Sequence, residues 1–154
     1  MKVIFIFLSL LFLNETTSCI AAENANMEQM HQDHMQHLML DGRTPLNLSP
    51  EMKQHQLANM RSHVKAVQSI IGLISVGDFE QASQVAYSKL GLTDEMKQMC
   101  GMFGNEKFEQ LGLAFHKSGD ELGKVLQTKD LAKSLQALHD TMGYCVQCHE
   151  TFRQ

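Results

Sequence analysis

The residues with the most specific spacing for chemistry lie at the C-terminal end of the chain, in the run Cys145-Val146-Gln147-Cys148-His149. Two cysteines separated by two residues and followed directly by histidine have the spacing of c-type haem attachment. Residues three apart on a helix share a side, so both thiols can bond the two vinyl groups of one porphyrin. His149 lies four residues after Cys145, where its imidazole can ligate the iron as the proximal ligand. The motif therefore predicts one covalent haem c.

The same cysteine pair also fits a redox-active dithiol or half of a zinc site. A thioredoxin-like dithiol belongs to a βαβ unit, whereas Cys145 and Cys148 are expected inside the last helix of the chain. A zinc site needs further ligands; Cys100 and a nearby histidine could supply them, but no spacing in the sequence requires it. We favour haem attachment and keep a thiol-disulfide oxidoreductase as an alternative function.

The remaining cysteines have other expected roles. Cys19 lies near the end of a stretch with one lysine, the apolar run 3–13 and Ala21-Ala22, which is the pattern of a secretory signal peptide. The apolar run is shorter than the ~20 residues that a membrane-spanning helix needs. We expect residues 1–22 to be removed on export to the periplasm; a retained anchor and lipidation at Cys19 are the alternatives. Cys100 is then unpaired and is expected to be a small buried residue.

Residues 23–48 have no sustained amphipathic pattern, and a flexible segment is expected there. Within it His31, His34 and His37 recur every three residues, with methionines between them. Imidazole and thioether suit copper, and thioether suits Cu(I) in particular. Copper binding by these histidines is a second alternative function, and the simpler interpretation is a solvated segment that binds no metal specifically.

Residues 49–154 predict one all-α domain. At Ser49-Pro50-Glu51 serine can cap a helix, proline fits its first position, and the acidic residue favours the positive helix end. A short helical segment is expected from Thr93 to Gly101 or Gly104. Four longer segments have apolar residues at steps of three and four: Leu57, Met60, Val64, Val67, Ile71 and Ile74; Phe79, Ala82, Ala86 and Leu90; Phe108, Leu111, Phe115, Leu122 and Leu126; and Leu131, Leu135, Leu138, Met142, Cys145, His149 and Phe152. Thr128 is expected to cap the last of them. These segments predict an antiparallel four-helix bundle.

The charge balance argues against nucleic acid as a partner. The chain has 13 Lys and Arg against 17 Asp and Glu, a formal net charge of −4. A nucleic-acid-binding domain would be expected to have a basic surface. Hydrophobic residues make up 44% of the chain, which is enough to form a core.

The closing motif Cys145-x-x-Cys148-His149-x-x-Phe152-Arg153, on the last helix of a predicted four-helix bundle, resembles that of the cytochrome c′ and cytochrome c-556 group. The resemblance covers residues 50–153, and the aromatic-Arg pair is its most specific part. It implies a periplasmic haem protein that exchanges one electron with a redox partner protein, or binds NO or CO, and that is not an enzyme. It also implies that Arg153 lies near the haem propionates and that the protein forms a homodimer.

The side of the iron opposite His149 decides between these activities. In the family that the chain resembles, the distal residue comes from the first helix, and the sequence rhythm places Leu57 there. Leucine cannot ligate, so the iron would be five-coordinate and open to small gases. Met60, one turn later, would instead give a six-coordinate iron of higher potential, which suits electron transfer. We slightly favour the open site.

Other histidines and methionines are weaker candidates. Met52 and His55, near the start of the same helix, are remote candidates for the distal position. Three histidines are expected at the surface or at an edge, and not as ligands: His63, His116 and His139.

Overall fold

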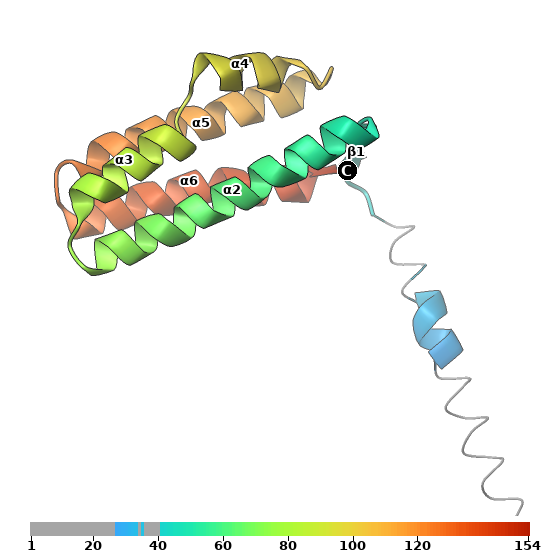
Figure 1. Ribbon diagram of the computed structural model, residues 1–154. Helices are drawn as coiled ribbons and strands as arrows, with labels where there is room; N and C mark the ends of the chain where they lie inside the picture. Colours follow the sequence, from blue (N-terminus) through green and yellow to red (C-terminus); the bar gives the residue numbers. More distant parts are fainter. Residues whose placement is uncertain (1–26, 34, 36–40) are drawn as a thin grey trace, which may run out of the picture. The chain divides into compact units, whose positions relative to one another are not determined.

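A computed structural model describes residues 27–33, 35 and 41–154 of the chain (Figure 1). The chain divides into two units, 1–42 and 43–154. In the first unit, the described residues 27–33 and 35 are helical and exposed, and His31 is among them. The expected signal peptide, with Cys19, lies outside the described residues, as do His34 and His37. No helix in the described part of the chain is long and apolar enough to span a membrane.

The second unit is built almost entirely of helices, so the predicted all-α class is confirmed. Its elements, in chain order, are β1 (Thr44–Pro45), α2 (Pro50–Ser75), α3 (Phe79–Lys89), α4 (Asp94–Gly101), α5 (Glu106–Leu126), α6 (Leu131–Thr151) and β2 (Phe152–Arg153). The two short strands pair in parallel, with Thr44 opposite Phe152.

Side-chain caps fix where the helices begin. The predicted start of α2 is confirmed, because the backbone N–H of Met52 donates to Ser49 Oγ at 3.3 Å. Asp78, Thr93 and Asn105 cap the next three helices in the same way. The last cap differs from the prediction: Asp130, not Thr128, accepts from the N–H of Lys133 at 3.0 Å, and an acidic cap also favours the positive end of the helix.

The closest helix packing joins α2 to α3, α3 to α5, α5 to α6 and α4 to α5. Figure 1 shows α2 and α6 as long neighbouring helices, but the pair is not among those that pack closely along their backbones. The main core lies between those ends of the helices that are remote from the C-terminus. Its fully buried large apolar side chains are Ile70, Leu90, Leu122 and Leu126.

The buried rows of α2 and α6 differ from the predicted stripes. On α2, Val64 is 71% exposed and Ile71 is 49% exposed, whereas Ala66 and Ile70 are buried. On α6 the buried residues are Ser134, Leu138 and Thr141, and the predicted core residues Leu131, Leu135 and Met142 are about half exposed. Thr141 can lie inside because the backbone satisfies its hydroxyl, which is within bonding distance of the Ser118 and Ala137 carbonyl oxygens. Prediction from hydrophobicity alone therefore gives the row of residues next to the one that is buried.

A second, smaller core ties the start of the unit to its end. Leu46, Phe108 and Phe152 are buried together, and the Leu46 N–H donates to the carbonyl oxygen of Arg153 at 3.0 Å. Residues 43–48 therefore pack with the helices, and the second unit begins at Arg43 and not at the expected position 49.

Candidate functional site

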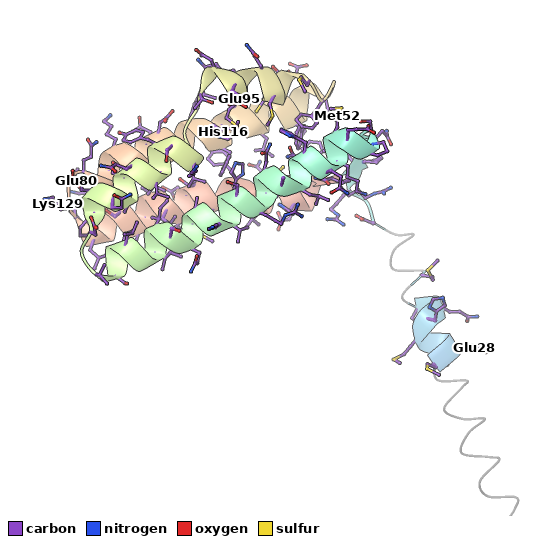
Figure 2. The ribbon with its side chains drawn as sticks, in the orientation of Figure 1. Glu28, Met52, Glu80, Glu95, His116 and Lys129 are labelled. Atoms are coloured by element: carbon purple, nitrogen blue, oxygen red, sulfur yellow. The ribbon has the colours of Figure 1, made fainter. Side chains whose placement is uncertain are left out.

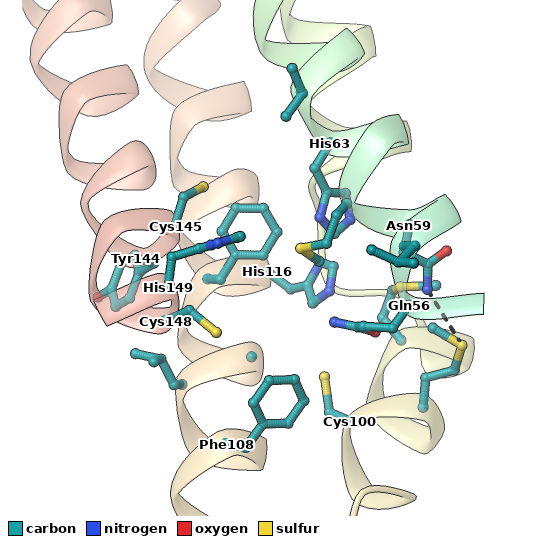
Figure 3. Close-up of a pocket in the computed structure, with 18 of the residues that line it drawn as sticks. Gln56, Asn59, His63, Cys100, Phe108, His116, Tyr144, Cys145, Cys148 and His149 are labelled. Carbon is teal, nitrogen blue, oxygen red and sulfur yellow. Dashed lines mark hydrogen bonds between the residues drawn. The ribbon is translucent and has the colours of Figure 1, made fainter. Parts of the chain in front are cut away.

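A cavity of about 510 Å³ lies among α2, α4, α5 and α6 (Figure 3). Its size falls in the range of pockets that hold small molecules and cofactors. Its wall is almost entirely apolar, with the Phe108 and Phe115 rings on α5 and methionines on α2 and α4. It occupies the region where α2 and α6 do not pack closely.

One wall of the cavity carries the predicted attachment motif. Cys145, Cys148 and His149 all line it, and Figure 3 shows them on one helix with the His149 ring directed toward the opposite wall. Both cysteines are half-buried free thiols on the buried row that continues Leu138 and Thr141. His149 is exposed and lies beside that row, so its predicted place within the core stripe is wrong, although it still reaches the cavity.

Burial controls the acidity of these thiols. It raises the pKa of Cys145, and it raises the pKa of Cys148 to about 11, with the nearby Cys145 adding to the effect. Both sulfurs are therefore protonated at neutral pH. Redox-active dithiols have lowered pKa values, because the thiolate is the nucleophile.

Both predicted distal residues lie on α2 at the same cavity. Leu57 and Met60 are both half-buried and both line it. Their positions are therefore compatible with either prediction, an open site at Leu57 or a ligand at Met60. Sequence reasoning missed Gln56, which is only 8% exposed and also lines the cavity. Gln56 is polar, so the spacing of apolar residues gave no indication that it is buried. It also missed Arg61, an exposed cation that lines the cavity next to Met60.

One histidine lies elsewhere than the sequence predicts, and a second lies beside it. His116 was expected at the surface but is 5% exposed, and Figure 2 shows it among the helices of the second unit. Its Nδ1 donates to the carbonyl oxygen of Leu90 at 2.9 Å, which satisfies one ring nitrogen inside the protein. His63 is half-buried on α2 and packs on Phe115, with ring centroids 4.9 Å apart. Both line the cavity, whereas His139 is exposed as predicted.

Burial also sets the charge of this histidine pair. It lowers the pKa of His63 to about 4, with the neighbouring His116 contributing. It lowers the pKa of His116 as well, against the opposing effects of hydrogen bonds to Leu90 and Gly91 and of the Asp120 carboxylate. At neutral pH the cavity therefore faces two uncharged imidazoles.

Cys100 is buried, as predicted, and it lines the cavity from α4. Its Sγ lies 2.9 Å from where a Cβ at position 112 would be, so glycine at that position makes room for the sulfur. Burial, with a smaller effect from Glu109, raises the pKa of the thiol.

The remaining predicted site residues lie elsewhere. Arg153 is exposed on β2 and is not among the residues that line the cavity. A different arginine is near the motif: Arg43 Nη1 donates to the His149 carbonyl oxygen at 3.2 Å. Within the described ranges, no three His, Cys, Asp or Glu side chains are grouped to hold a metal ion, and His31 belongs to the separate first unit.

No protein-family model, no curated protein and no solved structure matches the chain. The motif and the cavity that it faces are therefore the features that indicate a function. The resemblance to the cytochrome c′ and c-556 group stays a prediction from the motif.

Proposed function

We propose that the chain is a c-type haem protein whose helices α2, α3, α5 and α6 form an antiparallel four-helix bundle around one covalent haem. The observation that carries this proposal is the position of Cys145, Cys148 and His149 together on one wall of a large apolar cavity. The residues present fit the group: two half-buried thiols can form thioether bonds, and an imidazole beside them faces an apolar space. The haem would supply reversible one-electron chemistry or a site for a diatomic gas.

The residues on each wall of the cavity have a different role in this proposal. Cys145 and Cys148 would hold the group, and His149 would ligate its iron. Leu57 and Met60 would determine whether the iron takes a further ligand. The aromatic and methionine side chains exclude water, which in such sites favours a higher potential. The exposed Arg61 lines the cavity and would pair with a haem carboxylate, a role that the resemblance gives to Arg153.

The remaining parts of the proposal follow from the motif and from the resemblance. The protein carries one electron to a partner protein or binds NO or CO, and it is not an enzyme. It acts in the periplasm after removal of residues 1–22, and it forms a homodimer. The raised thiol pKa values argue against the thiol-disulfide oxidoreductase, because a protonated dithiol is a poor nucleophile in disulfide exchange.

The test is expression of the full chain with a c-type maturation system, followed by denaturing gel electrophoresis and haem staining. We expect stained protein of the mass of the chain without residues 1–22, and loss of stain in the double variant Cys145→Ser/Cys148→Ser. Cys100→Ser is the matched control and should retain the stain, since that thiol belongs to α4 and not to the motif. Unstained wild-type protein with free, reversibly oxidised thiols would replace the proposal by the dithiol alternative.

A further inference from the structure

A second, smaller pocket lies where the start of α2 meets the end of α4. Its volume is about 380 Å³. Three methionines and one histidine supply most of its wall, together with Glu51 and Phe103: Met52, His55, Met99 and Met102. It adjoins the larger cavity, because Met99 and Phe103 line both.

One contact in this pocket joins two donor atoms directly. His55 Nε2 lies 2.7 Å from Met99 Sδ. That separation is as short as an N–H···O hydrogen bond, although sulfur is the larger atom. The amide nitrogen of Asn59 approaches the same sulfur at 3.9 Å. The Met99 thioether is therefore turned toward the polar side chains of α2.

The donor atoms that line the pocket determine which metal ion it would bind best. Thioether sulfur is a soft donor that suits Cu(I), whereas Mg²⁺ and Ca²⁺ prefer carboxylate and carbonyl oxygens. One imidazole among three thioethers is a soft donor set with the number of ligands that Cu(I) takes. The carboxylate of Glu51 adds negative charge at the opening, which favours a cation. We propose that Met52, His55, Met99 and Met102 form a binding site for Cu(I).

The local structure holds these donors on two short, well-capped segments. Ser49 fixes the first turn of α2, which contains Met52 and leads to His55. The N–H of Met102 donates to the carbonyl oxygen of Met99 at 3.1 Å, so the other two thioethers share the last turn of α4. With N and S bond lengths of about 2.0–2.3 Å, binding would widen the His55–Met99 contact by ~1 Å. Met102 is 61% exposed, so an ion can enter from solvent.

This site is distinct from the histidines of the N-terminal segment and does not require haem. His31 belongs to the other unit, and no residue of the Cys145–His149 motif lines the smaller pocket. The proposal can therefore fail while the haem proposal stands, and the reverse also holds.

The experiment uses the full chain carrying ¹³C-methyl methionine and the substitutions His31→Ala, His34→Ala and His37→Ala, which remove the competing histidines of the N-terminal segment. Ag(I), a redox-inert soft cation, is added in steps and the methyl signals are followed by NMR. Signals are assigned from the single variants Met52→Leu, Met99→Leu and Met102→Leu, which conserve side-chain volume. We expect these three signals to move together over one equivalent.

A Cu(I) titration against a chromophoric competitor, under reductant, gives the affinity. Met99→Leu should weaken binding about tenfold or more, a loss typical of damage to a metal site. Met96→Leu is the matched control, because it lies on α4 but lines only the larger cavity, and it should change the affinity less than twofold. Movement confined to other methionines, or equal affinity in the Met99 and Met96 variants, would overturn the proposal.

Discussion

His63 on α2 and His116 on α5 meet edge to face beside the large cavity, with ring centroids 5.5 Å apart and planes at 78°. Each also contacts Phe115, at centroid distances of 4.9 Å. Two imidazoles this close and this buried resist protonation, since each charge would be desolvated and would repel the other. The pair therefore links the charge state of the cavity to the stability of the fold.

The first prediction is that stability falls as the pH decreases from about 6.5 to about 4. The folded pKa of His63 is lowered to about 4, so the unfolded chain binds a proton in this range that the folded chain does not. The stabilisation is complete above pH 6.5 and is lost as the pH falls through the folded pKa. The loss is on the order of 3 kcal/mol at most. Urea unfolding at a series of pH values measures it.

His63→Phe should flatten this pH dependence, because phenylalanine can pack on Phe115 without titrating. The control is His139→Gln, at an exposed position of α6, which should leave the slope unchanged. If His63→Phe and wild type lose stability equally between pH 6.5 and 4, the histidine pair is not the cause.

The second prediction rests on the proposed haem and concerns whether α2 would supply a further ligand to its iron. If Leu57 faces an open site, reduced protein is high-spin and shifts readily with CO, and Met60→Leu leaves that spectrum unchanged. If Met60 ligates instead, the wild type is low-spin and resists CO, and Met60→Leu converts it to the CO-binding form. Met96→Leu, on α4 at the same cavity, controls for loss of a methionine as such. We expect the open-site result, and visible spectra with and without CO distinguish the two.

The third prediction is that Cys100 is inert in the folded protein. It is 8% exposed and its pKa is raised by burial, so thiolate is scarce and reagents have little access. If haem occupies the other two described cysteines as proposed, a disulfide-exchange reagent should react with about one thiol per chain. The reaction should be quick after unfolding in urea and at least about tenfold slower before it. Fast reaction of the native protein, or a Cys100-dependent covalent dimer on a non-reducing gel, contradicts this.

The helices and the cap of the first long helix were predictable because their signals are local. Ser49 caps the helix that Ser49-Pro50-Glu51 indicates, and the Cys145–His149 motif lies on one wall of the cavity. The cap of the last helix was not predictable, because Asp130 takes the place expected for Thr128. The exact buried faces were not predictable, since they depend on which helix lies opposite. His116 is the clearest case: it is buried because the Leu90 carbonyl, from the end of α3, lies within 2.9 Å of its ring. No pattern within α5 could supply that partner.

The contacts of Arg43 and Leu46 with the end of the chain also could not be predicted from local sequence patterns. Their segment pairs with the last residues of the chain through β1 and β2, and the two strands are only two residues long. Such a pairing depends on a contact between the two ends of the unit. Leu46 carries no periodic signal of its own, although Phe108 and Phe152 bury it.

The last prediction tests the close packing of α5 against the end of α3. A Cβ at Gly119 would lie 2.8 Å from Leu90 Cβ and still closer to the Leu90 carbonyl, so α5 can approach the end of α3 only because this position has no side chain. Gly119→Ala should lower the free energy of unfolding by about 1–3 kcal/mol, as overpacking in a core does. Gly72→Ala, on an exposed face of α2 with nothing within 4 Å, should instead raise it by about 0.5–1 kcal/mol through helix propensity. Chemical unfolding of both variants measures the difference, and a stabilising Gly119→Ala would mean that α3 and α5 are not in this close contact.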